Sequence, residues 1–228
     1  MIKITLPDGK IKEFEPGISA LDVIKSIGPG LAKASLAAAL DGKPVDLSAK
    51  IDHDAQFSAL TFDSEKGKEV LRHSASHLMA QAVTELFPNT KAAIGPAIED
   101  GYYYDFDRPE PFSSDDLSAI EKKMAELAAK DISIVRQEMP REQALEHFQA
   151  KGEPYKVELI ASLPAGEVIS FYKQGNFIDL CRGPHLPSTG RIKHFKLLSV
   201  AGAYWRGDER NQMLQRIYGT VFDKKEQL

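Results

Sequence analysis

The histidines of this sequence are six in number, and two of them have a spacing that could support chemistry. His73 and His77 lie four residues apart in a segment with helical periodicity, so their side chains point from one face. Counted from Leu71 at 100° per residue, they lie at about 200° and 240°, while the apolar stripe lies near 0°. They are therefore not simply part of the main core face of that helix. Two surface histidines remain an alternative, because such pairs arise often by chance.

A second pair occurs more than a hundred residues later, where Cys181 and His185 stand at CxxxH spacing in the run CRGPH. Gly183 and Pro184 impose a defined bend between these two side chains. Two histidines from a helix with a cysteine and a histidine from a turn make a possible tetrahedral zinc site. The same four groups could instead form a metal-free pocket that positions a water molecule. The spacing leaves both alternatives open.

Other polar and aromatic residues could join such a pocket. The run GYYYDFD, residues 101–107, concentrates tyrosines, and we expect Tyr102 and Tyr103 to pack against a neighbouring strand. Taken alone, Lys156 is predicted to be an ordinary surface lysine. Trp205 is predicted to pack in the interior, while its neighbour Arg206 could touch phosphate.

Residues 1–62 are predicted to form a small domain of their own. An alternating strand and the turn PDGK lead into a return strand, and Ser19 is predicted to cap a short helix with Asp22 in its first turn. A second hairpin follows with Asp41 and Gly42 at its tip, and then a final strand. Two hairpins, one helix and a last strand indicate a β-grasp, or ubiquitin-like, fold.

Residues 63–228 are predicted to form a larger domain that begins with the linker-like segment DSEK. A long helix is expected over about 65–87, with an apolar stripe that includes Leu86. A second helix is expected to open at Ser114, and a third to begin at Pro140 after a strand. From Glu167 onward the pattern is rich in strands, including the run AYWRG. The whole chain is therefore predicted to be α+β.

Composition and charge restrict the function classes. The net charge is −4, but the segment from Cys181 to the end contains nine Lys and Arg and only four Asp and Glu. This local positive excess could bind phosphates, or it could belong to a solvated surface of mixed charge. One cysteine allows no internal disulfide and fits a reducing, cytoplasmic location. No apolar run approaches the roughly 18 to 20 residues of a membrane span, and the start does not resemble a secretory signal.

Several of these runs resemble a known family in order and spacing. RHSASHLMAQAV, AIGPAIEDGYYYDFD, YKVELI, FIDLCRGPHLPSTG and FKLLSVAGAYWRGD resemble the editing domain of bacterial threonyl-tRNA synthetases. TLPDGK and IGPGLAKA resemble the small TGS domain that this family shares with certain GTPases and alarmone enzymes. The resemblance covers essentially the whole chain and places it at the amino-terminal third of a synthetase.

The resemblance implies an activity, namely hydrolysis of serine wrongly attached to threonine tRNA. Within that family the matching positions imply catalytic roles for His73, His77 and Lys156. Substrate contacts are implied for four further residues, Tyr104, Asp179, Cys181 and His185. Cys181 is expected to be a pocket wall or polar contact rather than a nucleophile, and Asp179 to bind the substrate amino group.

The resemblance also implies cofactors and partners. The editing pocket is expected to work without metal, with zinc at the His, His, Cys and His set as the lesser alternative. Zinc, ATP and magnesium are expected only in the catalytic body, which this sequence does not resemble. The expected partner is tRNA, and the full-length protein is expected to be a homodimer. The charged ending DKKEQL suggests a truncated chain.

Two other function classes compete with the hydrolase. A pure tRNA-binding module would not require the His, Cys and Lys set. A zinc-stabilised structural domain would unfold with a chelator.

Overall fold

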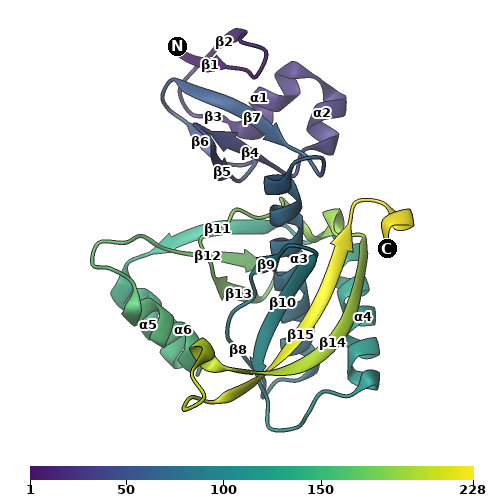
Figure 1. Ribbon diagram of the computed structural model, residues 1–228. Helices are drawn as coiled ribbons and strands as arrows, with labels where there is room; N and C mark the ends of the chain where they lie inside the picture. Colours follow the sequence, from purple (N-terminus) through teal and green to yellow (C-terminus); the bar gives the residue numbers. More distant parts are fainter. The chain divides into compact units, whose positions relative to one another are not determined.

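The computed structural model describes residues 1–228, which form two compact units (Figure 1). The first unit comprises Met1–Leu71 with Gly183–Pro187, and the second comprises Arg72–Arg182 with Ser188–Leu228. The two units share one long helix, α3 (Glu65–Leu86). The domain boundary predicted between residues 62 and 63 stays a prediction. The mixture of helices and strands confirms the α+β class.

The first unit is built on a five-stranded sheet with the order β2-β1-β7-β4-β5, in which β1 and β7 run parallel. Helices α1 and α2 and the short pair β3 and β6 complete it. Its elements are β1 (Ile2–Thr5), β2 (Ile11–Phe14), β3 (Ile18–Ser19), α1 (Ala20–Ile27), α2 (Pro29–Ala34), β4 (Ala37–Leu40), β5 (Lys43–Val45), β6 (Lys50–Ile51) and β7 (Ala55–Leu60).

Local sequence signals explain how this unit is put together. The Ser19 side chain accepts a hydrogen bond from the Asp22 amide, so the predicted N-cap of α1 is confirmed. Asp41 and Gly42 have φ angles of 47° and 77°, which is the conformation that a tight two-residue hairpin requires. The predicted tip of the β4–β5 hairpin is therefore confirmed. Helix α2 and the β3–β6 pair were not predicted.

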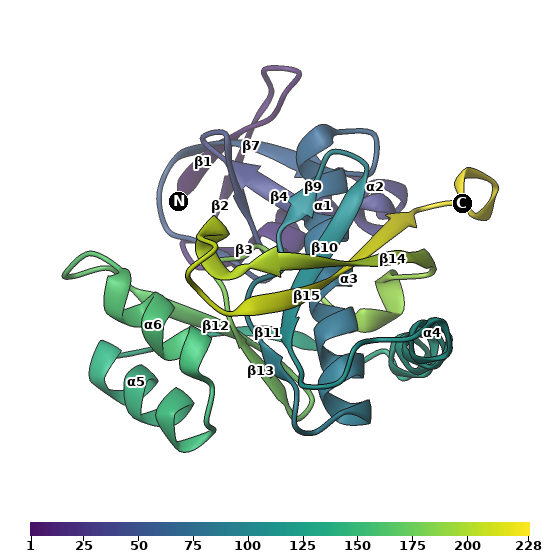
Figure 2. The same ribbon diagram turned by 60° about the horizontal axis from the view of Figure 1, so that its bottom comes forward.

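The second unit contains a four-stranded sheet of order β14-β15-β10-β8, with β9 paired to β10, and a three-stranded sheet of order β11-β12-β13. Its remaining elements are β8 (Lys91–Ala92), β9 (Ala97–Ile98), β10 (Gly101–Asp107), α4 (Ser114–Ala129), β11 (Ile134–Met139), α5 (Arg141–Ala150), α6 (Pro154–Ser162), β12 (Ile169–Gln174), β13 (Phe177–Leu180), β14 (His194–Tyr204) and β15 (Met213–Phe222). Helices α5 and α6 lie side by side, and α3 passes behind the sheet that contains β10 (Figures 1 and 2).

Helix α3 is buried on nearly every side through its middle, not only along one stripe. Leu71, Ala75 and Leu78 are fully buried as predicted, but so are the side chains of Ser74 and Ser76 on other faces. His77 is 5% exposed and His73 is partly buried, so the alternative of two exposed surface histidines is wrong. At the end of the helix the predicted buried stripe is interrupted, because Leu86 is 38% exposed.

Helix α4 begins at Ser114, as predicted, and Ser113 is its N-cap, because the Ser113 side chain and Asp116 form a reciprocal capping box. One boundary differs from the sequence expectation. The predicted strand AYWRG is split: β14 ends at Tyr204, and Trp205–Gly207 form a 3₁₀ turn in which Arg206 has a φ of 56°. A side chain in that backbone region breaks the ladder.

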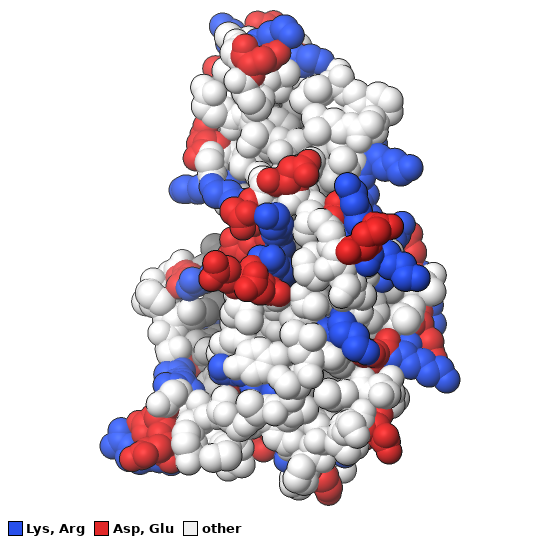
Figure 3. Space-filling model, turned by 45° about the vertical axis from the view of Figure 1, so that its right-hand side comes forward, with Lys and Arg blue, Asp and Glu red and all other residues white.

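The carboxyl-terminal positive charges are largely paired with acids. Arg182 meets Glu167, Lys196 meets Glu121, Arg206 meets Glu158, Arg210 meets Asp208, and Arg216 meets Asp105. Positive and negative side chains are interspersed on the face drawn in Figure 3. The reading as a mixed solvated surface therefore gains support over a phosphate-binding patch.

None of the helices is both long enough and apolar enough to span a bilayer.

Candidate active site

The carboxylate of Asp179 is the centre of a buried polar network in the second unit. It lies on β13, is 1% exposed, and accepts a hydrogen bond of 2.5 Å from the Tyr104 hydroxyl. The Nδ1 atom of His77 lies 3.1 Å from the same oxygen, and Lys156 pairs with the other oxygen. A buried carboxylate is tolerated only with such partners. Asp179 on β13 therefore contacts side chains from α3, α6 and β10.

Lys156 is only 4% exposed, so the prediction of an ordinary surface lysine is wrong. It lies in the first turn of α6 and donates to the Ala93 carbonyl at 2.8 Å and to the Tyr104 hydroxyl at 2.9 Å. Its ammonium also forms an ion pair with the Asp179 carboxylate. The positive charge of Lys156 is thus held inside the network rather than offered to solvent.

Tyr104 connects the lysine and the aspartate. Its hydroxyl accepts from Lys156 and donates to Asp179. Burial and the neighbouring Asp179 carboxylate hold the pKa of the Tyr104 hydroxyl well above its usual value of 10, so it stays a donor. Its ring stacks on Phe106 and leaves no room for a β-carbon at Gly95, which would come within 2.0 Å of the ring.

The two histidines of α3 are neutral near pH 7. Burial lowers the pKa of His73 from 6.5 to about 4, although the Asp179 charge opposes the shift. Burial is the largest cause that lowers the pKa of His77 well below 6.5, and the neighbouring His73 and Lys156 groups lower it further because each disfavours a second positive charge. Because a carboxylate accepts at Nδ1 of His77, the proton lies on Nδ1 and the Nε2 atom keeps a lone pair.

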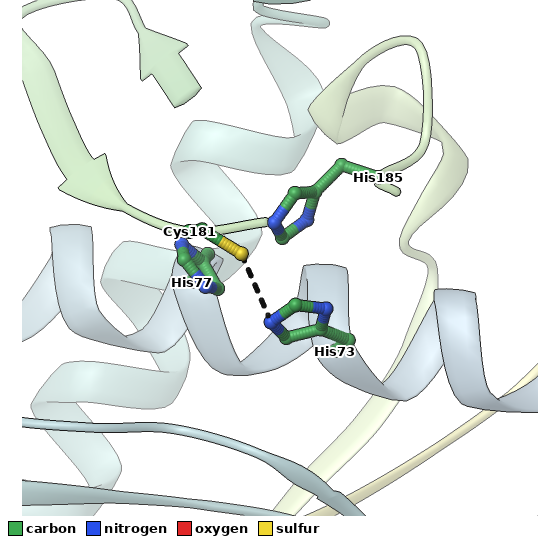
Figure 4. Close-up of side chains that lie close together, drawn as sticks. All are labelled: His73, His77, Cys181 and His185. Atoms are coloured by element: carbon green, nitrogen blue, oxygen red, sulfur yellow. Dashed lines mark hydrogen bonds between the residues drawn. The ribbon is translucent and has the colours of Figure 1, made fainter. Parts of the chain in front are cut away.

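Cys181 lies directly after β13, with its sulfur 3.4 Å from Nε2 of His73 (Figure 4). Its backbone is fixed to β12, because the Cys181 amide donates to the Ser170 carbonyl and the Ser170 hydroxyl donates to the Cys181 carbonyl. The thiol is consequently aimed at the helix by the strand pairing. His185 follows in the loop, and its amide donates to Asp46 within the first compact unit.

One ligand atom from each of His73, His77, Cys181 and His185 lies within 4.8 Å of every other (Figure 4). The two predicted pairs are therefore brought together. Tetrahedral zinc with ordinary bond lengths needs ligand atoms roughly 3.3 to 3.8 Å apart. The Cys181–His73 distance already fits, whereas the widest separation would have to contract by about 1 Å. The residue types are those that bind zinc. The contact between the Asp179 carboxylate and Nδ1 of His77 also suits a zinc ligand, because a metal-bound histidine commonly donates its other ring N–H to a carboxylate.

The remaining sequence predictions fall outside this network. Tyr103 faces Tyr218 across β10 and β15 with their rings 5.9 Å apart, so the cross-strand packing is confirmed. Trp205 is 5% exposed and packs against Tyr155, which confirms its structural role.

Sequence reasoning missed two residues that shape the site. Gly95 makes room for the Tyr104 ring, and Ser170 fixes the Cys181 backbone. A glycine next to a proline in GPAIEDG is a turn signal, but it does not say which ring lies against it.

Comparison with known protein families finds two matches, one in each part of the chain. Residues 2–58 match the TGS domain, and residues 169–218 match the family described as "Threonyl and Alanyl tRNA synthetase second additional domain". The second match includes Asp179, Cys181 and His185. The second description names the threonyl- and alanyl-tRNA synthetases, so this part of the chain is similar to a domain of that class of enzymes.

The chain is also similar along its whole length to individual enzymes of that class. It is 57% identical over 228 residues to threonine--tRNA ligases of Laribacter hongkongensis and Rickettsia rickettsii, and 54% identical to that of Acetivibrio thermocellus. It spans 36% of the length of these relatives. The sequence is therefore similar to a part of these threonine--tRNA ligases that is 228 residues long.

Proposed function

We propose that residues 63–228 hydrolyse the ester bond that joins serine to threonine-specific tRNA, and so remove serine attached in error. The observation that carries this proposal is the buried Lys156–Tyr104–Asp179–His77 network beside His73 and Cys181. A binding module has no need to bury a cation, a carboxylate and two neutral histidines together.

The proposal answers a physical problem. Serine lacks one methyl group of threonine, and a missing methyl group changes binding by only roughly 1 to 3 kcal/mol. A pocket made for threonine admits the smaller serine, so a second site that hydrolyses the wrong product supplies the missing discrimination.

The reaction needs a water molecule, a proton acceptor and a donor for the developing oxyanion. The water oxygen attacks the ester carbonyl carbon, the bond from that carbon to the ribose oxygen breaks, and the water proton finally reaches the ribose oxygen. His73, neutral at pH 7, is proposed as the acceptor, with the Nε2 atom of His77 beside it. The products are serine and free tRNA.

Lys156, Asp179 and Tyr104 are proposed to hold this arrangement in place. Binding of the substrate amino group by Asp179 stays a prediction, and it requires one of three existing contacts of that carboxylate to give way. Cys181 and His185 are proposed to line the pocket around the seryl group. Cys181 is not proposed as a nucleophile, so no thioester should be trapped.

The pocket is proposed to act without metal. The tRNA partner, the homodimer of the full-length protein and a cytoplasmic location remain proposals of the same kind.

The test compares serine release from seryl-tRNA by the chain and by His73→Ala. His53→Ala is the matched control, because His53 is an exposed histidine of the first unit. We expect release to fall at least tenfold in His73→Ala and to stay unchanged in His53→Ala. Equal release by all three proteins would overturn the assignment of His73.

A further inference from the structure

The run AYWRGD contacts helix α6, the helix that carries Lys156. After β14 ends, residues 205–207 turn away from the sheet and lie beside α6 (Figure 1). The Nε1–H group of Trp205 donates to one carboxylate oxygen of Glu158 at 2.9 Å, and the Nε atom of Arg206 lies 3.0 Å from the other oxygen. Two neighbouring side chains of the turn therefore hold one carboxylate of α6.

The same turn packs against the residue that precedes Lys156. The Tyr155 ring meets the Trp205 ring edge-on with their centroids 4.9 Å apart, and the Tyr155 hydroxyl donates to Asp107 at 2.7 Å. Tyr155, Trp205 and Ala93 belong to one buried cluster, and the Ala93 carbonyl accepts a hydrogen bond from Lys156. Trp205 therefore packs against the chain neighbour of Lys156 and against one of its hydrogen-bond partners.

These contacts lie on one face of α6. At about 100° per residue, Tyr155, Glu158 and Ser162 fall within about 60° of one another around the helix. Arg206 contacts two successive turns of this face, because it also donates to the Ser162 hydroxyl at 3.4 Å. Since the helix is rigid, holding this face sets the rotation of α6 about its axis. That rotation in turn sets the direction in which Lys156 points.

The backbone of Arg206 has a conformation that arginine rarely adopts. Its φ of 56° and ψ of 19° lie in the left-handed region, which suits glycine and, less often, asparagine or aspartate. Such conformations persist only where surrounding contacts hold them, and they cluster at functional sites. Here the Trp205 amide donates to the Gln212 carbonyl, and the Asn211 side chain donates to the Trp205 carbonyl. An arginine at a position that suits glycine indicates a use for its guanidinium.

We propose that Trp205 and Arg206 are positioning residues for Lys156, and that they act through the face of α6 that they contact. This inference deepens the proposed function and rests on it. Neither side chain touches the substrate. They fix the rotation of α6, so that the Lys156 ammonium stays beside Tyr104 and Asp179.

Two variants of the turn test this role. Arg206→Gly removes the contact with Glu158 and should fold, because glycine readily adopts the left-handed backbone. Arg210→Gly is its matched control, since Arg210 lies in the same turn, pairs with Asp208 and has a side chain that is 85% exposed. Trp205→Phe removes the N–H donor but keeps an aromatic ring in the buried cluster.

The first readout is the accessibility of the Lys156 amine. The intact chain is treated briefly with an acetylating reagent, and peptide mass spectrometry compares Lys156, which is 4% exposed, with the exposed Lys151. A buried amine reacts only when its surroundings open, so Lys156 should react far more slowly than Lys151. We expect Lys156 to react about fivefold faster or more in Arg206→Gly, and also faster in Trp205→Phe. Arg210→Gly should leave its rate unchanged.

The second readout separates kcat from KM for serine release. In Arg206→Gly we expect kcat to fall roughly fivefold or more and KM to stay within about twofold, because Lys156 acts at the reacting group and not in tRNA binding. Arg210→Gly should change neither constant. A raised KM with an unchanged kcat would overturn the proposal and would assign Arg206 to a phosphate of the tRNA.

The proposal is also overturned if Lys156 is acetylated as slowly in both variants of the turn as in the unaltered chain. Acetylation is read without hydrolysis. A chain whose acetylation changes as expected but which releases no serine therefore contradicts the proposed hydrolysis and not the positioning of Lys156.

Discussion

At the scale of single residues, the site contains one buried cation, Lys156, and one buried anion, Asp179, surrounded by neutral groups. Lys156 and Asp179 compensate each other, while the lowered pKa values of His73 and His77 keep both rings uncharged near pH 7. A network of this kind is stable only when all its members are satisfied. Removing one polar atom from this network should therefore lower stability and activity, whereas the same change at an exposed residue should not.

The Tyr104 hydroxyl provides such a test, and the adjacent Tyr103 is its control. Tyr104→Phe removes the donor to Asp179 and the acceptor from Lys156. We expect the free energy of unfolding to fall by about 1 to 3 kcal/mol and serine release to fall roughly tenfold or more. Tyr103→Phe, on the other face of β10, should change both by little. Urea unfolding and the release assay measure them, and equal effects of the two variants would contradict the network.

The neutral state of His73 predicts how stability depends on pH. The unfolded chain takes up a proton near pH 6.5, whereas the folded chain takes it up only near pH 4. As the pH falls from about 7.5 to about 5, the unfolded state gains a proton that the folded state refuses, so His73 lowers the free energy of unfolding by about 2 kcal/mol. Urea unfolding in metal-free buffer measures this.

The slope with pH should be smaller in His73→Gln and unchanged in the exposed control His53→Gln. An identical pH dependence in all three proteins would show that His73 is not kept neutral by burial.

At the scale of elements, the sequence pattern predicted where helix α3 lies in the chain, but not which other elements pack around it. The helical pattern placed α3 over about 65–87, and the structure has it over Glu65–Leu86. The pattern could not show that layers on several sides would bury the face that carries His77. The position of Lys156 was missed for the same reason, since its partners Ala93, Tyr104 and Asp179 are distant in sequence.

The close approach of Gly95 to Tyr104 predicts a large effect of one methyl group. In Gly95→Ala the added carbon would lie 2.0 Å from the ring, so the ring or the loop must move. We expect a loss of about 1 to 3 kcal/mol of stability together with reduced serine release. The control is Gly30→Ala in α2, where no atom lies within 4 Å of the added carbon.

Gly30→Ala should be neutral or stabilising by up to about 1 kcal/mol, because alanine favours helix. Thermal unfolding of both variants decides the matter. A neutral Gly95→Ala would mean that the Tyr104 ring is not held by that loop.

At the scale of the whole molecule, the two domain families and the relatedness along the full length place the chain among threonine--tRNA ligase sequences. The motif CRGPH and the His73–His77 pair were sufficient to predict which residues meet. Spacing could not decide between zinc and water, because both use the same residue types.

Metal content separates these alternatives for the intact chain. We expect elemental analysis to find less than stoichiometric zinc, and a chelator to leave both the unfolding midpoint and serine release unchanged. One zinc per chain, with destabilisation on chelation, would contradict the metal-free proposal and favour a structural or catalytic zinc site.

The central claim is that this site removes serine and spares threonine. The most direct measurement is the rate of amino acid release from seryl-tRNA and from threonyl-tRNA, both carried on threonine-specific tRNA, by the same preparation of the chain. Selective release of serine, faster by roughly tenfold or more, is the predicted result. Equal release of the two amino acids, or no release from either by folded protein with tRNA in excess, would contradict it.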